Sequence, residues 1–171
     1  SIAGLLYMLP LGMASAVAIR IGQAQGAGNT SGLRPIGLAA LAVVSAWTLA
    51  STLVLLVSGE AIARLIAPDP QTAALAAGLF VVVAAMQVMD GLQSTSLGAL
   101  RGMRDNAFPA FVSIAVYWGL ALPAAYGAAF GLNMGPAGVW AGFGAGLAVA
   151  SVVLVWRFAR LTRARSIEPL C

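Results

Sequence analysis

The chain has 171 residues, of which 61% are hydrophobic and only 8% are charged, whereas about one quarter of an ordinary soluble domain is charged. It contains no histidine and a single cysteine, Cys171, so a zinc site, a Cys–His nucleophile pair and a disulfide framework are all excluded within this chain. All nine basic residues are arginine and the net charge is +4, but so apolar a chain is not typical of a nucleic-acid-binding domain.

Five apolar runs of about 20 residues, the length that crosses some 30 Å of hydrocarbon as a helix, follow one another along the sequence. Short connectors rich in glycine, proline, asparagine and charged residues separate them. The predicted spans cover residues 2–19, 36–58, 72–100, 107–130 and 137–156, and an arginine-rich tail occupies 157–171. Because a helix satisfies its own backbone hydrogen bonds and the runs show no barrel-like alternation, the sequence predicts an all-α integral membrane protein.

Arginine is concentrated on one side of these spans. The first and third connectors and the tail hold eight arginines, whereas the second connector holds only Arg64 and the fourth holds none. Positive residues favour the cytoplasmic side, so Ser1 is predicted outside and Cys171 in the cytoplasm of a bacterium, with the spans in its inner membrane. Ser1 is not an initiator methionine and the opening residues already belong to an apolar run, which indicates a C-terminal piece of a longer polytopic protein.

Asp90 is the charged residue that falls well inside a span. At 1.5 Å per residue it lies about 16 Å from Arg101, near the bilayer midplane, where an ionised carboxylate is costly. Helical spacing places Gln87 and Ser94 on the same face and Gln93 beside them, so the carboxylate is expected to face a polar cavity. Desolvation disfavours the charged form and a bound cation favours it, which suits a group that takes up and releases Na+ or H+. The alternative is a structural carboxylate that bonds a neighbouring helix.

Glycines and prolines predict how the helices pack and bend. Gly138, Gly142 and Gly146 recur at four-residue spacing in the last span and would let another helix approach closely. Pro10 in the first span and Pro123 in the fourth each remove a backbone hydrogen bond, which predicts kinks that are either hinges or static bends. Aromatic side chains fit either interface belts or walls of a substrate site, and both assignments stay open for Tyr7, Trp47, Tyr117, Trp118, Tyr126, Trp140 and Trp156.

Several stretches, in this order and spacing, resemble the multidrug and toxic compound extrusion (MATE) family of cation-coupled antiporters. The most specific is QVMDGLQ at 87–93, which runs into GALRG at 98–102. It is preceded by PLG at 10–12, AIRIG at 18–22 and QGAG at 25–28, and followed by LPAAY at 122–126 and GPAGVWAG at 135–142. Together these stretches cover nearly the whole chain.

The resemblance implies two six-helix lobes around a central cavity, with this chain forming five helices, the eighth to the twelfth, of the C-terminal lobe. The N-terminal lobe and the first helix of this lobe would then be its missing partners. Asp90 matches the tenth-helix aspartate that NorM-type members use in a cation site. Met86, one turn earlier, stands where some members have an aromatic, and with Tyr117 and Tyr126 it is expected to line the substrate cavity.

The leading hypothesis is that the parent protein exports organic cations or other amphipathic drugs by alternating access. The coupling ion, Na+ or H+, would bind Asp90 with Gln87, Gln93 and Ser94 around it, and neither a cofactor nor an enzymatic reaction is expected. Membrane lipid is expected to surround the helices, and no nucleic acid is expected as a partner.

Three alternatives to this hypothesis differ in what they require of the sequence. A non-transporting membrane scaffold or assembly subunit is favoured by the glycine stripe. A lipid-linked saccharide flippase of the same broad superfamily would need a basic cavity, and no arginine lies mid-span. An intramembrane aspartyl protease needs two facing acids within the membrane, and only Asp90 qualifies.

Overall fold

The computed structural model describes residues 2–66 and 69–167, which are helical almost throughout apart from the short connectors. In chain order the elements are α1 (Ile2–Gly26), α2 (Leu33–Ile66), α3 (Pro70–Gly102), α4 (Ala107–Val116), η1 (Tyr117–Ala121), α5 (Leu122–Tyr126), η2 (Gly127–Gly131) and α6 (Pro136–Ile167). The elements from α4 to η2 follow without a break and form one helix, in which η1 and η2 are π-helical turns. The predicted all-α architecture is confirmed.

The helices are long enough to cross a bilayer. Within the described parts of the chain, four stretches are both long and apolar enough: Gly4–Gly26, Leu33–Leu65, Ala107–Gly131 and Pro136–Ala164. The helix α3 has 33 residues, which corresponds to about 50 Å at 1.5 Å per residue. Each predicted span falls within one helix, but the helices continue past the apolar runs, as where Arg64 and Glu60 form an ion pair near the end of α2. The depth at which lipid meets each helix stays a prediction.

The connectors after α1 and α3 stop these helices through left-handed residues. Gly28 has a φ of +71° and Arg104 a φ of +62°. After α3, the backbone N–H of Asp105 donates to the carbonyl oxygen of Leu100 at 3.0 Å, which is the Schellman arrangement that satisfies the last carbonyls of a helix. The chain therefore turns sharply and brings Asp105 next to the start of α4.

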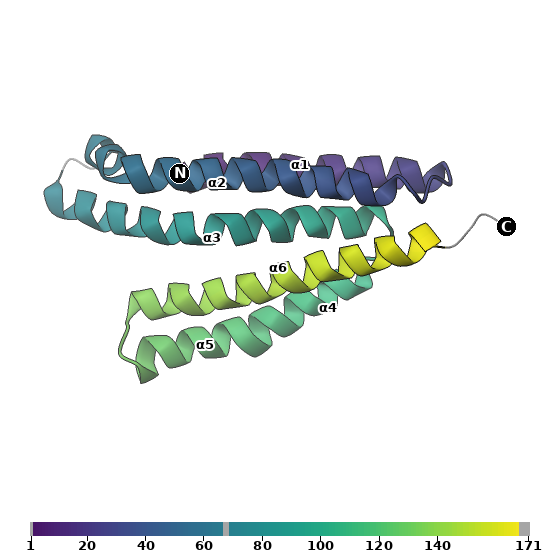
Figure 1. Ribbon diagram of the computed structural model, residues 1–171. Helices are drawn as coiled ribbons and strands as arrows, with labels where there is room; N and C mark the ends of the chain where they lie inside the picture. Colours follow the sequence, from purple (N-terminus) through teal and green to yellow (C-terminus); the bar gives the residue numbers. More distant parts are fainter. Residues whose placement is uncertain (1, 67–68, 168–171) are drawn as a thin grey trace.

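Figure 1 shows two groups of helices: α1, α2 and α3 lie together, and the helix from α4 to η2 pairs with α6. The α1–α2 and α3–α4 connectors and the C-terminal end of α6 lie at the same end of the bundle, so the arginine-rich segments gather there. At this end α6 approaches α3, and toward the other end the two helices diverge. The hydrophobic core lies at the convergent end and includes Val17, Ile21, Leu33, Leu100, Met103, Leu154 and Phe158.

An ion pair fastens α6 to the α3–α4 connector at the convergent end. Arg157 Nε donates to Asp105 Oδ2 at 2.9 Å, and the two side chains are only 28% and 17% exposed. The guanidinium also lies 4.5 Å from the ring centroid of Phe108, a favourable cation–π geometry. Because this charge pair is largely withdrawn from water, it is screened less than a surface pair would be.

We expect Arg157→Gln to lower the free energy of unfolding of the full-length protein by about 1–3 kcal/mol, because the change leaves the Asp105 carboxylate without its charged donor. Chemical unfolding in detergent measures this. Arg163→Gln is the matched control, since Arg163 is an exposed arginine of the same helix. An equal effect of the two substitutions would show that only net charge matters.

Candidate functional site

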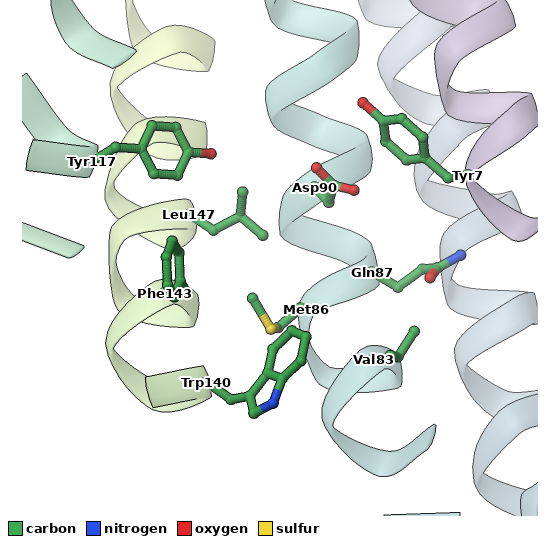
Figure 2. A pocket seen from close by; sticks show the side chains of 9 residues that line it. All are labelled: Tyr7, Val83, Met86, Gln87, Asp90, Tyr117, Trp140, Phe143 and Leu147. Atoms are coloured by element: carbon green, nitrogen blue, oxygen red, sulfur yellow. The ribbon is translucent and has the colours of Figure 1, made fainter. Parts of the chain in front are cut away.

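A cavity of about 280 Å³ lies between α1, α3, η1 and α6. Figure 2 shows the nine side chains that line it, and these come from helices far apart in the sequence. They are Tyr7, Val83, Met86, Gln87, Asp90, Tyr117, Trp140, Phe143 and Leu147. The lining is thus mostly aromatic and aliphatic, with a few polar groups and a single carboxylate.

The helix α3 supplies the acidic wall of this cavity. Val83, Gln87 and Asp90 are spaced by four and three residues and therefore lie on one helical face, with Met86 beside them. Figure 2 shows Asp90 between Tyr7 on one side and the η1–α6 side of the cavity on the other. The predicted position of Asp90 in a partly polar cavity matches this geometry, while its role as an ion site stays a prediction.

Tyr7 of α1 is a polar neighbour of Asp90 across the cavity. Its hydroxyl interacts with the carboxylate and with the hydroxyl of Ser94. Within the described residues no three His, Cys, Asp or Glu side chains cluster as they would around a transition metal. The donors at this point are carboxylate and hydroxyl oxygens, which suit a proton or a hard monovalent cation rather than a soft metal.

The four residues predicted to form the ion site do not all face the cavity. Gln87 lines it, and its Nε2 also donates to Ser51 Oγ of α2 at 3.3 Å. Ser94 donates to the carbonyl oxygen of Gly91 at 3.2 Å, one turn back on its own helix. Gln93 turns toward η1, where it pairs with Tyr117.

The structure separates the aromatic residues, for which the sequence left two assignments open. Tyr7, Tyr117 and Trp140 line the cavity. Tyr126 does not: it is 70% exposed and packs against Phe130 with ring centroids 4.9 Å apart. It therefore lies apart from Met86 and Tyr117, with which it was grouped in the sequence-based expectation.

Three lining residues were not named from the sequence, namely Val83, Phe143 and Leu147, while Tyr7 and Trp140 were named only as aromatic residues with an open assignment. Phe143 and Leu147 follow Trp140 by three and seven residues, so they share its face of α6. That spacing is visible in the sequence, but it is equally typical of a packed core face. Only the arrangement of the helices shows that the face borders a cavity.

The glycine stripe of α6 faces the preceding helix. A side chain at Gly138, Gly142 or Gly146 would collide with Ala129, Ala125 or Ala121 respectively. These three alanines are buried and are spaced by four residues. Close contact between α6 and the preceding helix fixes the position of the cavity wall that α6 provides.

The π-helical turns explain how the alanine row stays aligned. In a regular α-helix four residues overshoot a full turn by about 40°, so a row at this spacing drifts around the helix. The wider turns of η1 and η2 offset the drift and keep Ala121, Ala125 and Ala129 toward α6. Tyr117 starts the same row and reaches the cavity.

The two prolines for which the sequence predicted kinks lie in different surroundings. Pro123, which lacks an N–H, lies between the two π turns, where the helix is irregular. Pro10 is buried within the continuous helix α1.

Comparisons with known proteins agree with this architecture. A family model described as MatE matches residues 1–127. The chain is 36% identical over 166 residues to a probable multidrug resistance protein NorM of Rhodopseudomonas palustris, covering 95% of this chain and 35% of that protein. It is 38% identical over 163 residues to the multidrug resistance protein NorM of Burkholderia vietnamiensis, covering 92% of this chain and 35% of that protein. The chain thus spans about a third of the length of these relatives.

Among solved structures, the chain is similar to the eukaryotic MATE transporter AtDTX14. The TM-score is 0.84 at 22% sequence identity, over 95% of this chain and 38% of that structure. At this identity the similarity shows a shared fold.

Proposed function

Because the chain belongs to the MatE family, as its motifs suggested, we propose that the full-length protein exports amphipathic organic cations by alternating access, driven by Na+ or H+. Asp90 would bind the coupling ion. The observation that carries this proposal is one carboxylate, deep in an apolar helix, that lines an aromatic cavity shared by α1, α3, η1 and α6. Intramembrane acids with access to a cavity mark ion and substrate pathways.

The walls of the cavity suit an amphipathic cation. The rings of Tyr7, Tyr117, Trp140 and Phe143 offer faces that attract a positive charge and bury apolar surface. Met86 adds a flexible, polarisable side chain that adapts to ligands of different shapes. No described residue that lines the cavity is basic, which disfavours the anionic head group of a lipid-linked saccharide as substrate.

Coupling follows if the ion and the organic cation compete for Asp90. An ion that binds one facing state more tightly shifts the population toward that state, and the shift is limited by its difference in affinity. Binding of the ion at Asp90 would neutralise the charge that holds the organic cation and so favour its release. Either Na+ or H+ satisfies this scheme.

The proposed orientation places the convergent end of the bundle in the cytoplasm of a bacterium. It is supported by the arginine-rich connectors and the arginine-rich end of α6, which share that end. The divergent end, toward which α3 and α6 separate, would then face outward across the inner membrane.

Cells that express the full-length protein are expected to accumulate less ethidium, a fluorescent organic cation, than cells with an empty vector. A protonophore or removal of external Na+ should restore accumulation, depending on which ion drives export. Fluorescence of the cells measures both effects. Equal accumulation with and without the protein, at matched membrane expression, would contradict export and favour a scaffold role.

A further inference from the structure

The paired side chains of Gln93 and Tyr117 link the acidic wall of the cavity to the irregular helix. The Tyr117 hydroxyl donates to Gln93 Oε1 at 3.2 Å and lies 3.1 Å from Gln93 Nε2. Gln93 is only 9% exposed, so its amide is sheltered from water, and loss of its bond to the hydroxyl would be costly. The bond joins α3 to the first residue of η1.

Tyr117 lines the same cavity as Asp90, while its hydroxyl bonds Gln93. Figure 2 shows the Tyr117 hydroxyl directed toward the α3 side. Gln93 lies one helical turn beyond Asp90, so the two side chains start about 5–6 Å apart. A rotation of the tyrosine side chain that broke its bond to Gln93 would therefore leave Asp90 as another acceptor in the same cavity.

A phenol that donates to an ionised carboxylate stabilises the charged form and occupies a lone pair that a cation would use. Were the Tyr117 hydroxyl free, it would compete with the coupling ion for Asp90. Gln93 removes this competition, because its carbonyl oxygen already accepts the phenolic proton.

We propose that Gln93 is a positioning residue that holds the Tyr117 hydroxyl away from Asp90 and thereby keeps the carboxylate available to the coupling ion. This inference rests on the proposed function, since it concerns the affinity of the same carboxylate. It gives Gln93 a different role from a ligand of the ion, because its amide acts on the tyrosine and not on the cation.

The test is transport of ethidium by the full-length protein in proteoliposomes, with Na+ titrated at fixed pH and H+ titrated at fixed Na+. Gln93→Met, which keeps the length of the side chain but replaces the amide with a thioether, a much weaker acceptor, is expected to raise the half-saturating concentration of the coupling ion about fivefold, as loss of one buried hydrogen bond would. Tyr117→Phe keeps the ring that lines the cavity and removes only the hydroxyl, so it serves as the reference for the double variant. The double variant should have the same half-saturating concentration as Tyr117→Phe, because the competing hydroxyl is absent from both.

The decisive measurement is whether Tyr117→Phe cancels the effect of Gln93→Met on the half-saturating concentration. If Gln93 only stabilised the fold, removal of its partner hydroxyl would not restore the affinity for the ion. The inference is overturned if Gln93→Met leaves the half-saturating concentration unchanged, or if the double variant is as impaired as Gln93→Met. Ser113→Ala is the matched control: Ser113 lies one turn before Tyr117 and bonds the Pro109 carbonyl of its own helix.

Failure of this inference differs from failure of the proposed function. If Asp90→Asn abolishes coupled transport while Gln93→Met is silent, only the role of Gln93 is wrong. If Asp90→Asn leaves coupled transport intact, the proposed ion site itself is wrong. If Gln93→Met does not fold, Tyr117→Phe provides a second test. An ion affinity of Tyr117→Phe clearly below that of the parent protein would overturn the inference, because the hydroxyl would then be a ligand of the ion and not its competitor.

Discussion

Replacing Asp90 with asparagine in the full-length protein is expected to abolish cation-driven export while the helix bundle stays folded. Asparagine has nearly the same shape as aspartate but carries no charge and takes up no proton at the carboxyl position. Neither Na+ nor H+ then binds one of the two states, inward-facing or outward-facing, more tightly than the other. The free energy that couples ion entry to export is therefore lost. Coupling free energies between sites correspond to about 5- to 150-fold changes, so complete loss of the coupling is expected to lower gradient-driven export by a factor in the upper part of this range.

Gradient-driven uptake of ethidium into proteoliposomes measures the loss, and size-exclusion chromatography of the purified variant in detergent shows whether the helix bundle is still folded. Glu60→Gln is the matched control, because it makes the same change from carboxylate to amide at an exposed position where Glu60 pairs with Arg64. Coupled transport that survives Asp90→Asn, or an equal loss in Glu60→Gln, would contradict the proposed ion site.

The sequence predicted those features of the site that depend on one helix alone. Asp90 stands out because a charge in the middle of an apolar run is costly wherever the helix packs. The glycine stripe of α6 stands out because four-residue spacing places small residues on one face. Both arguments need only the periodicity of a helix, and neither needs to know which helix lies opposite.

Features that depend on neighbouring helices could not be predicted from the sequence. Tyr7 meets Asp90 only because α1 packs against α3, and the hydrogen-bond partner of Gln93 is Tyr117, which lies 24 residues further along the chain. Tyr126 was expected in the cavity by its type and its span, but it lies nine residues after Tyr117, on an exposed face. The two π turns carry no plain sequence signal, since Pro123 disturbs the backbone without indicating which kind of turn results.

The contact between α6 and the preceding helix gives the largest effect expected on the fold. Gly142 lies so close to Ala125 that a Cβ added at Gly142 would overlap the backbone nitrogen of Ala125 as well as its Cα. Backbone atoms cannot turn aside as a flexible side chain does, so the two helices must separate along the whole row of glycines and alanines.

We therefore expect Gly142→Ala to destabilise the full-length protein by about 1–3 kcal/mol or more, the usual range for overpacking, even though alanine is the better helix former. Heating in detergent followed by size-exclusion chromatography measures the loss as a lower temperature of aggregation. Gly127→Ala is the matched control, because Gly127 lies in the opposite helix and an added Cβ would meet nothing within 4 Å. Because the same methyl group is added in both variants, a lower stability of Gly142→Ala than of Gly127→Ala reports the close approach of the helices at Gly142. Equal stability would mean that α6 does not pack through this stripe, and the cavity wall carrying Trp140 and Phe143 would then have to be placed differently.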